Sequence, residues 1–350
     1  LESEQRPGGK IWTEKSGGFL CESGVNGFLY NKPRTLELSK KLSLQPLRSS
    51  DASRKRFIFS GGRLHRLPES PPAFLASGLM SLYGKLRLMA ELVIPGDARE
   101  EETLAAFARR RLGKAAYEKL IDPMASGIYA GNPETLSLRA CFPRVYDLEV
   151  LYGGLIRGMI RLQKERKKKG SAEKVGAGPG GTLTSFYGGM GELVNAIRDF
   201  LGQRLRLASR VQGIDIKGRG FALFFADGSS MDADIVVSAS PAYAVSAMLR
   251  DMDRPLSNLV AEIPYPSLSV ICLGYRKEKV TSPVDAFGFL IPSTEKRKIL
   301  GTLYDSSIFP NRAPEGYVLL RSMVGGARAS ELAQENEAKL VDLVKGELAA

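Results

Sequence analysis

An acid, an arginine and two glycines follow one another near the start of the chain and could together bind a dinucleotide. The segment is LESEQRPGGK, residues 1–10. An acidic residue that ends the second strand of a Rossmann unit can accept hydrogen bonds from a ribose hydroxyl, and Glu2 offers that chemistry. Glycine lets backbone come close to a ligand, so Gly8 and Gly9, together with Arg6, could approach a phosphate.

A second glycine pattern, Gly176-x-Gly178-x-x-Gly181, matches the dinucleotide fingerprint by spacing alone. That fingerprint requires a buried strand before it and a helix that begins within the glycines. Here a lysine-rich loop precedes the pattern and Pro179 lies inside it. We therefore interpret this stretch as a flexible linker.

Cysteine and histidine are too sparse to indicate thiol, imidazole or metal chemistry. Cys21, Cys141 and Cys272 lie far apart with no C-x-x-C pair, which argues against a disulfide framework or a zinc site and makes a reducing compartment the default. The one histidine, His65, stands in a predicted hairpin and is interpreted as a solvated side chain. We predict no catalytic side chain and no metal site.

The length and charge of the chain bound its class. Its 350 residues are enough for two or three domains, and 43% hydrophobic residues allow a sizeable core. A net charge of +12 favours an acidic partner, whether nucleic acid, anionic lipid or a carboxylated substrate, or else marks a basic but inert surface. The chain opens inside a motif and ends in a helical run, so we expect it to be truncated at both ends.

The periodicity of apolar residues predicts a mixed α/β fold. Strands are expected at 18–22, 211–216, 221–225, 235–237, 267–275, 288–291 and 318–324, a hairpin at 56–64, and helices from residue 33 and at 104–112, 117–124, 148–162, 193–201 and 331–348. The run Ile235-Val236-Val237 is typical of a strand buried on both faces. Helices in the middle of the chain, flanked by strands, indicate an α/β sheet that carries an inserted helical domain.

Residues 71–94 are unusually apolar, with no charge between Pro71 and Gly84. The stretch is too short to cross a bilayer, which needs roughly 20 residues. It could form a buried core helix or a helix lying in a membrane interface. From the residues alone, burial is the commoner fate.

Longer motifs resemble the protoporphyrinogen and coproporphyrinogen oxidase family of amine-oxidase-like flavoproteins. The quoted segments are SGIYAGNPETLS at 126–137, ESGVNGF at 22–28, KRFI at 55–58, SFYGGMGEL at 185–193 and FPNRAPEG at 309–316. They occur in the order of the family with similar gaps, and the opening acid, arginine and glycine pair matches the family's E-x-x-x-R-x-G-G stretch. The resemblance covers nearly the whole chain.

The resemblance implies FAD as cofactor. It assigns Glu2 to the adenosine ribose, the residues after it to the pyrophosphate, a glycine turn to the flavin, and Val211 to the adenine through its backbone. Pro241 follows a predicted strand, and open α/β sheets bind ligands at the carboxyl ends of strands. The residues implied for FAD are Glu2, Arg6, Gly8, Gly9, Lys10, Gly188, Gly189, Gly191, Val211 and Pro241.

The resemblance also implies five substrate contacts. Arg56 aligns with an arginine that pairs with a propionate, which suits a guanidinium because its fork takes a carboxylate bidentately. Phe309 aligns with an aromatic packed on a pyrrole ring, and Gly127 with a glycine where a side chain would collide with the macrocycle. Asn26 aligns with a polar residue near the substrate, and Leu290 with an apolar contact.

The family's organisation implies three domains. An incomplete Rossmann-like FAD-binding domain would comprise residues 1–46 and 181–252, with its phosphate loop and C-terminal part missing. A mixed-sheet substrate domain would comprise 47–66 and 253–350, and a helical membrane-binding domain 67–180. The resemblance thus favours interfacial contact for Phe74–Ile94 over burial.

The implied function is the oxygen-dependent, six-electron oxidation of protoporphyrinogen IX to protoporphyrin IX in haem biosynthesis. The flavin carries the chemistry while the protein positions the macrocycle. Expected partners are the porphyrinogen, molecular oxygen and the inner face of the cell membrane, bound peripherally from the cytoplasm. A homodimer is a further expectation, and nucleic acid is not expected to bind.

Three alternatives remain at this point. A coproporphyrinogen III oxidase of the same fold would form coproporphyrin III. Another amine-oxidase-like flavoenzyme, such as a carotene desaturase, fits less well with the stretch Gly127–Gly131. A non-catalytic basic protein that binds membrane or RNA would carry no flavin.

Overall fold

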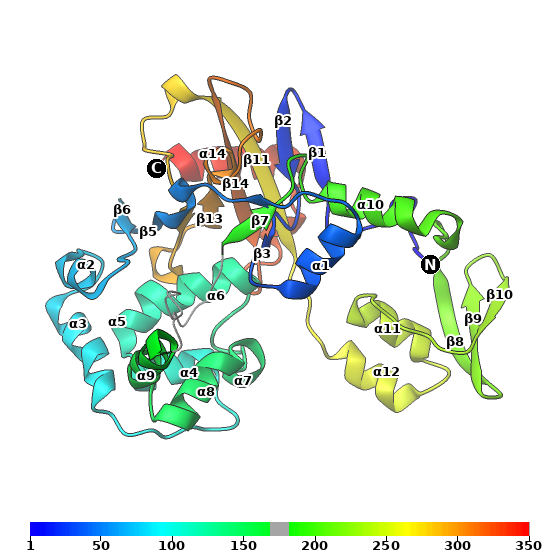
Figure 1. Cartoon of the computed structure of the whole chain (residues 1–350), viewed down its shortest axis with the longest axis horizontal. Helices are drawn as coiled ribbons and strands as arrows, with labels where there is room; N and C mark the ends of the chain where they lie inside the picture. The colour runs from blue at the N-terminus through cyan, green and yellow to red at the C-terminus, as the bar shows by residue number, and fades with distance from the viewer. Residues whose placement is uncertain (169–181, 350) are drawn as a thin grey trace.

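A six-stranded mixed sheet forms the centre of the computed structural model, which describes residues 1–168 and 182–349 (Figure 1). Its strands, in spatial order, are β11 (Leu268–Arg276), β14 (Tyr317–Gly325), β13 (Ile299–Leu303), β12 (Gly288–Leu290), β5 (Arg56–Ser60) and β6 (Arg63–Arg66). Only the β5–β12 pair is parallel. The apolar runs of β11 and β14 favour extended backbone, and β14 is buried over almost its whole length.

The C-terminal helix α14 (Glu337–Ala349) covers one face of this sheet. Ile271 and Val324 point to that face and pack with Leu340 and Val344 of the helix. A single helix was predicted over 331–348, whereas the structure has a 3₁₀ turn at Leu332–Gln334 and begins α14 at Glu337.

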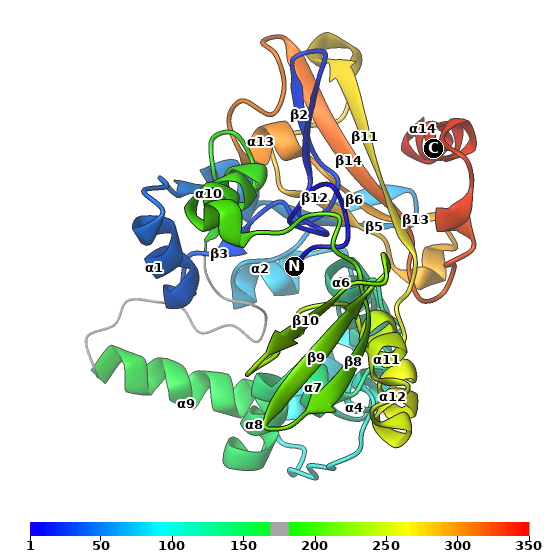
Figure 2. The ribbon, with the colours of Figure 1, turned by 90° about the vertical axis from the view of Figure 1, so that its right-hand side faces the viewer.

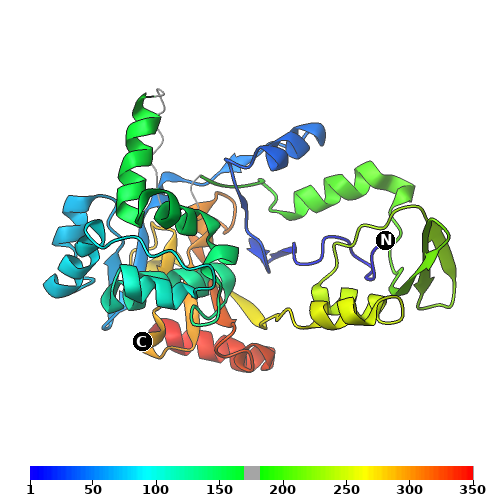
Figure 3. The same ribbon diagram turned by 90° about the horizontal axis from the view of Figure 1, so that it is seen from below.

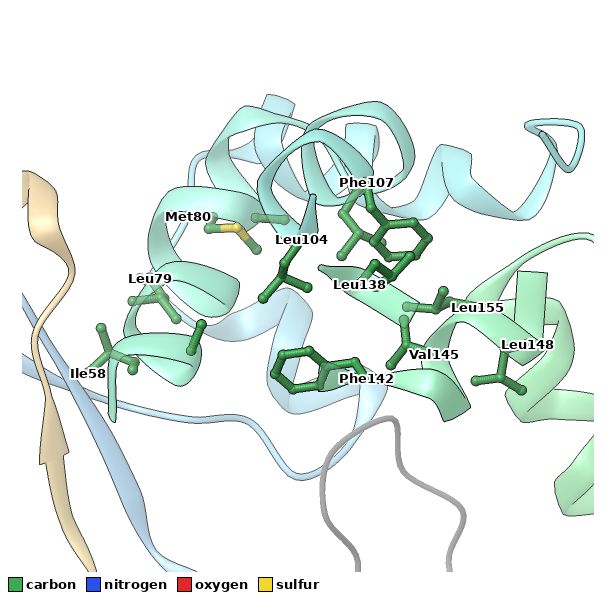
Figure 4. Packing of buried hydrophobic residues seen from close by; sticks show 13 residues of the cluster. Ile58, Leu79, Met80, Leu104, Phe107, Leu138, Phe142, Val145, Leu148 and Leu155 are labelled. Atoms are coloured by element: carbon green, nitrogen blue, oxygen red, sulfur yellow. The ribbon is translucent and has the colours of Figure 1, made fainter. Parts of the chain in front are cut away.

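The helical domain lies against the other face of the sheet. Its helices are α2 (Pro71–Ala76), α3 (Leu82–Met89), α4 (Leu104–Arg111), α5 (Lys114–Ala116), α6 (Asp122–Tyr129), α7 (Leu138–Cys141), α8 (Pro143–Tyr152) and α9 (Leu155–Lys168). Leu104, Phe107 and Leu138 are buried in its core, which also includes Ile58 of β5 (Figure 4). Each such side chain contributes roughly 1.5–3 kcal/mol through burial, so this core fastens the domain to the sheet.

The single helix predicted over 148–162 is wrong, because the chain breaks between α8 and α9. Gly153 adopts a positive φ of +72° and ends α8. A Cβ on Gly154 would lie 2.3 Å from Nη2 of Arg111 and 2.6 Å from a carboxylate oxygen of Glu91. Glu91 accepts hydrogen bonds from the N–H groups of Leu155 and Ile156, so it caps α9. The break is therefore set by a buried ion pair distant in sequence.

A second lobe holds the parts assigned to FAD. It contains α10 (Gly191–Leu201), β8 (Val211–Lys217), β9 (Gly220–Phe225), β10 (Ser230–Ala233), α11 (Ala242–Leu249) and α12 (Arg254–Ala261). Figure 3 shows this lobe, with the chain's N-terminus, at the opposite end of the molecule from the helical domain. The hairpin of β1 (Thr13–Ser16) and β2 (Phe19–Glu22), the small sheet of β3 (Phe28–Leu29), β7 (Leu183–Ser185) and β4 (Leu47–Arg48), and α1 (Pro33–Lys41) lie between them.

The buried strand predicted at Ile235–Val237 is wrong. The segment pairs with no strand among residues 1–168 and 182–349, and Ile235 and Val237 are 80% and 88% exposed. An apolar run becomes a strand only where a neighbouring strand takes up its backbone hydrogen bonds. The rejected glycine pattern at 176–181 lies outside the described residues. Every helix among those described residues is too short or too polar to span a bilayer.

Candidate functional site

A row of paired residues crosses five strands of the central sheet. Arg56 pairs with Gly288, Gly288 with Leu303, Leu303 with Arg321, and Arg321 with Cys272. Residues paired directly across strands point to the same side of a sheet, so these residues share one face, which we call the inner face. Strands lie about 4.8 Å apart, so Arg56 on β5 and Arg321 on β14 are separated by roughly 14 Å.

Gly127 and Leu290 meet where the helical domain covers the inner face. Leu290 pairs with Ile58, two residues along from Arg56, and α6 packs against β12 and β13. A Cβ on Gly127 would lie 2.5 Å from Cδ2 of Leu290, so any side chain at this position would force Leu290 to move. The structure thus brings these two predicted substrate residues together, on the same face as Arg56.

Arg56 is the predicted propionate ligand. Its guanidinium lies 5.0 Å from the ring centroid of Phe287, and no carboxylate of the described residues forms an ion pair with it. The side chain reaches solvent, yet surrounding protein lowers the pKa of Arg56 by desolvation. An arginine remains charged under such a shift, because its intrinsic pKa is so high. Arg56 is therefore a cation available to an anionic ligand.

Asn26 and Phe309 belong to a second group around Asp305. Helix α13 (Asp305–Ile308) begins two residues after Leu303, and Phe309 follows it with 2% exposure. Nε of Arg321 lies 2.9 Å from Oδ2 of Asp305, with both side chains buried. Nδ2 of Asn26 is buried without a well-aligned hydrogen bond among the described residues, although its proximity helps to counter the burial that raises the pKa of Asp305.

Sequence reasoning missed the buried charges of this group. Arg321 donates to the carbonyl oxygens of Glu22 and Gly24, at 3.2 and 2.9 Å. Arg312 donates to Ser185 Oγ and to the carbonyl oxygen of Phe186, each at 3.2 Å. Arg321 stands alone in the apolar strand segment YVLLRSMVG. Because a buried charge requires a partner, this pattern could have indicated a buried ion pair.

The N-terminal segment fits part of a dinucleotide. Glu2 exchanges backbone hydrogen bonds with Arg206 and Ser209, just before Val211 and β8, so the predicted ribose and adenine residues lie together. Among the described residues, its carboxylate accepts hydrogen bonds from the neighbouring Ser3 hydroxyl and Glu4 N–H alone, at 3.2 and 3.1 Å, which leaves lone pairs for ribose hydroxyls.

The loop after Glu2 is shaped by Arg6, whose guanidinium donates to the carbonyl oxygens of Pro7, Gly9 and Ile11. Gly8 and Gly9 have positive φ angles of +103° and +51°, and no atom lies within 4 Å of a Cβ built on Gly9. Lys10 is exposed beside them. The open backbone at Gly9, with a nearby ammonium group, fits a pyrophosphate. Gly8 instead packs against Val194 of α10, whose methyl groups would lie 2.8 Å from a Cβ on this glycine.

The glycine turn before α10 contacts the β1–β2 hairpin. The N–H groups of Met190 and Gly191 donate to Glu22 and Thr13, at 2.7 and 2.8 Å, and that of Gly188 donates to Glu192. A Cβ on Gly189 would lie 2.5 Å from Cγ2 of Thr13. These donors are thus taken within the chain, and any flavin contact here must use other backbone atoms.

Val211 and Pro241 lie on either side of one small core. The Val211 side chain packs against the cluster of Ile214, Leu223 and Met248. Pro241 is the N-cap residue of α11, which packs on β8. The assignments of both residues to FAD stay predictions.

Comparisons with known proteins agree with one another. The family described as flavin containing amine oxidoreductase matches residues 1–350. The chain is 33% identical to protoporphyrinogen oxidase 1, chloroplastic, of Arabidopsis thaliana, over 99% of this chain and 67% of that protein. It is 29% identical to the coproporphyrinogen III oxidase of Bacillus subtilis, over 99% and 75%. A solved structure from Exiguobacterium sp. 255-15, provisionally named a protoporphyrinogen oxidase, superposes with a TM-score of 0.81 at 25% identity, over 99% and 75%.

Proposed function

Because the chain belongs to the family of flavin containing amine oxidoreductases, we propose that it is an oxygen-dependent protoporphyrinogen oxidase that forms protoporphyrin IX in haem biosynthesis. It is an FAD-dependent oxidoreductase of the same α/β fold as its relatives. The substrate in this proposal is taken from the names of the plant relatives. The chain spans about two thirds of the length of the Arabidopsis protein.

The observation that carries the proposal is the position of Arg56 relative to the contact between Gly127 and Leu290. One end of the site offers a cation without a carboxylate partner among the described residues, and the other offers a closely packed apolar wall. A porphyrinogen has the matching chemistry, because it is an apolar macrocycle with carboxylate side chains. Arg56 would hold a propionate while Leu290 and Gly127 set the height available to the ring.

FAD, when bound, would supply the acceptor for hydride from a bridging carbon of the substrate, and an oxygen-dependent oxidase of this kind would release hydrogen peroxide. The chain's own residues hold and orient the macrocycle and exclude competing reactions. Glu2, Gly8, Gly9 and Lys10 would hold the ribose and pyrophosphate, as the fit of their backbone supports.

Coproporphyrinogen III is the second candidate substrate, and the match to the Bacillus subtilis enzyme favours it. That substrate carries four carboxylates and calls for more cations. The row of paired residues on the inner face contains one arginine besides Arg56. This is Arg321, whose charge is already neutralised by Asp305. This arrangement supports the substrate with fewer carboxylates.

Peripheral binding to the inner face of the cell membrane, from the cytoplasm, is part of the proposal. Leu82, Leu86, Met89 and Val93 follow helical spacing on and just after α3 and are 71%, 59%, 44% and 73% exposed. Tyr83 beside them is 79% exposed. An apolar stripe of this kind suits an interfacial helix. A homodimer is also proposed, and light scattering would test it.

The test of function is turnover. The full-length protein, purified and supplied with FAD, oxygen and either porphyrinogen, should develop porphyrin fluorescence and release hydrogen peroxide, with the higher kcat/KM for protoporphyrinogen. A preference for coproporphyrinogen would select the second candidate. A flavin-loaded protein that oxidises neither would point to another amine-oxidase-like activity.

A further inference from the structure

Cys272 lies at the end of the paired row on the inner face, opposite Arg321. The β1–β2 hairpin lies beside β11 and β14 at this end of the sheet (Figure 2). Phe19 of β2 packs on Gly274, where a Cβ would lie 2.4 Å from Cζ of its ring. Cys21 is two residues from Phe19 and Cys272 is two residues from Gly274, so both cysteines point to the surface where the hairpin meets the sheet.

The two thiols meet in that interface. Both cysteines are free and half-buried. Arg321, which pairs with Cys272 across β11 and β14, donates to the carbonyl oxygen of Glu22, the residue after Cys21, so both cysteines lie beside the same guanidinium. The neighbouring Cys272 thiol, helped by the charge of Arg321, lowers the pKa of Cys21, whereas Cys21 and burial raise the pKa of Cys272. A thiolate is the reactive form of cysteine, so the pair contains one favoured nucleophile and one neighbouring thiol.

We propose that Cys21 and Cys272 form a reversible disulfide site whose oxidant is hydrogen peroxide. The Cys21 thiolate attacks one peroxide oxygen, the O–O bond breaks, and after protonation the products are a sulfenic acid and water. The Cys272 sulfur then attacks the Cys21 sulfur and displaces a second water. In total, two thiols lose two hydrogens and one peroxide becomes two waters.

The source of the peroxide rests on the proposed function, because an oxygen-dependent oxidase releases that product beside its own chain. The bond would join the hairpin to the substrate sheet. Glu22, next to Cys21, holds Thr13 and the N–H of Met190, so the cross-link would tie the glycine turn before α10 to β11. We expect oxidation to raise the thermal unfolding temperature, and a dithiol reductant to reverse the rise.

The test treats the purified chain with added hydrogen peroxide, so that it requires no porphyrinogen turnover. Free thiols should fall from three to one, and peptide mapping should find Cys21 joined to Cys272. Cys141 lies at the end of α7 in the helical domain, and Cys141→Ser is the matched control. That variant should lose both of its thiols and show the same cross-link.

Single variants test the order of attack. Cys272→Ser should accumulate a sulfenic acid on Cys21 that a cyclic 1,3-diketone traps, whereas Cys21→Ser should react slowly and trap little. The proposal is overturned if peroxide leaves three thiols, if the cross-link joins two chains, or if Cys141 reacts first. A protein that oxidises no porphyrinogen but still forms the Cys21–Cys272 bond would refute the proposed function and support the disulfide site.

Discussion

Leu290 lies so close to Gly127 that a methyl group on the glycine would be 2.5 Å from its Cδ2 atom. Gly127→Ala should therefore push Leu290 into the substrate space, because overpacking of this kind typically costs about 1–3 kcal/mol. We expect kcat/KM for protoporphyrinogen to fall about tenfold, although alanine is the better helix former at this position in α6.

The double variant Gly127→Ala, Leu290→Ala checks that the contact is responsible. Removing the Leu290 side chain makes room for the methyl group, so the double variant should recover activity relative to Gly127→Ala. Steady-state kinetics of the four proteins give the coupling directly. Additive losses would show that the two residues act on different steps.

The ion pair of Glu91 and Arg111 should dominate the stability of the helical domain. Both side chains are fully buried, and Glu91 also caps α9. Glu91→Ala removes the nearer carboxylate from Arg111 and leaves Glu149, 3.6 Å from Nη1, as its remaining partner, so the change should cost about 3–5 kcal/mol of unfolding free energy. The exposed pair Arg34–Glu37 is the matched control, and Glu37→Ala should cost no more than about 0.5 kcal/mol. Denaturant unfolding of both variants measures the difference. Equal losses of unfolding free energy would contradict the dominant role of the Glu91–Arg111 ion pair.

Glu22 should make stability depend on pH. Burial raises the pKa of Glu22 above its ordinary 4.5, despite the hydrogen bonds from Thr13 and Met190. In the window above pH 4.5 the folded chain then holds a proton that the unfolded chain has lost, so this residue's contribution to stability falls as pH rises. The melting temperature of the wild type, measured relative to that of Glu22→Gln, should be highest below pH 4.5 and should fall as the pH rises to neutral. Melting temperatures of both proteins across this range test the sign, and a relative gain with rising pH would contradict it.

The exposed face of α3 should mediate membrane contact. Leu82→Gln with Leu86→Gln should lower affinity for phosphatidylglycerol vesicles at least tenfold, since each buried leucine is worth roughly 1.5–3 kcal/mol. The folded circular dichroism spectrum should persist. Leu79, which is 5% exposed, supplies the contrast, because Leu79→Gln should destabilise the fold. Unchanged vesicle binding in the double variant would remove this face from the proposal.

Most strands could be predicted from the sequence, because runs of β-branched and aromatic residues, such as those of β11 and β14, favour extended backbone over helix. It did not predict the break at Gly153–Gly154, which depends on Arg111 and Glu91 from another part of the chain. Nor did it predict that Ile235–Val237 would lie exposed, since an apolar run alone does not supply a pairing partner. Arg56, Gly127 and Leu290 were identified through resemblance, and their shared face follows from strand register. The ion pair of Asp305 and Arg321 could be recognised only once the fold showed that the two residues are in contact.

Arg56 should hold a substrate carboxylate, and the variant Arg56→Ala reports on that contact. A charge-assisted hydrogen bond contributes about 1.5–3 kcal/mol, so kcat/KM for protoporphyrinogen should fall roughly 10- to 100-fold, mostly through KM. Flavin content should not change. Phe309→Ala should also weaken substrate binding without loss of FAD. Arg54, two positions earlier, is exposed and pairs with Asp51, so Arg54→Ala is the control and should keep wild-type kinetics.

The decisive measurement follows porphyrin fluorescence in oxygenated buffer against substrate concentration for the full-length wild type, Arg56→Ala and Arg54→Ala proteins. A KM raised in Arg56→Ala alone, with FAD retained, is the result that we predict. Unchanged kinetics in Arg56→Ala would contradict the substrate site, and loss of FAD from that variant would assign Arg56 to the cofactor.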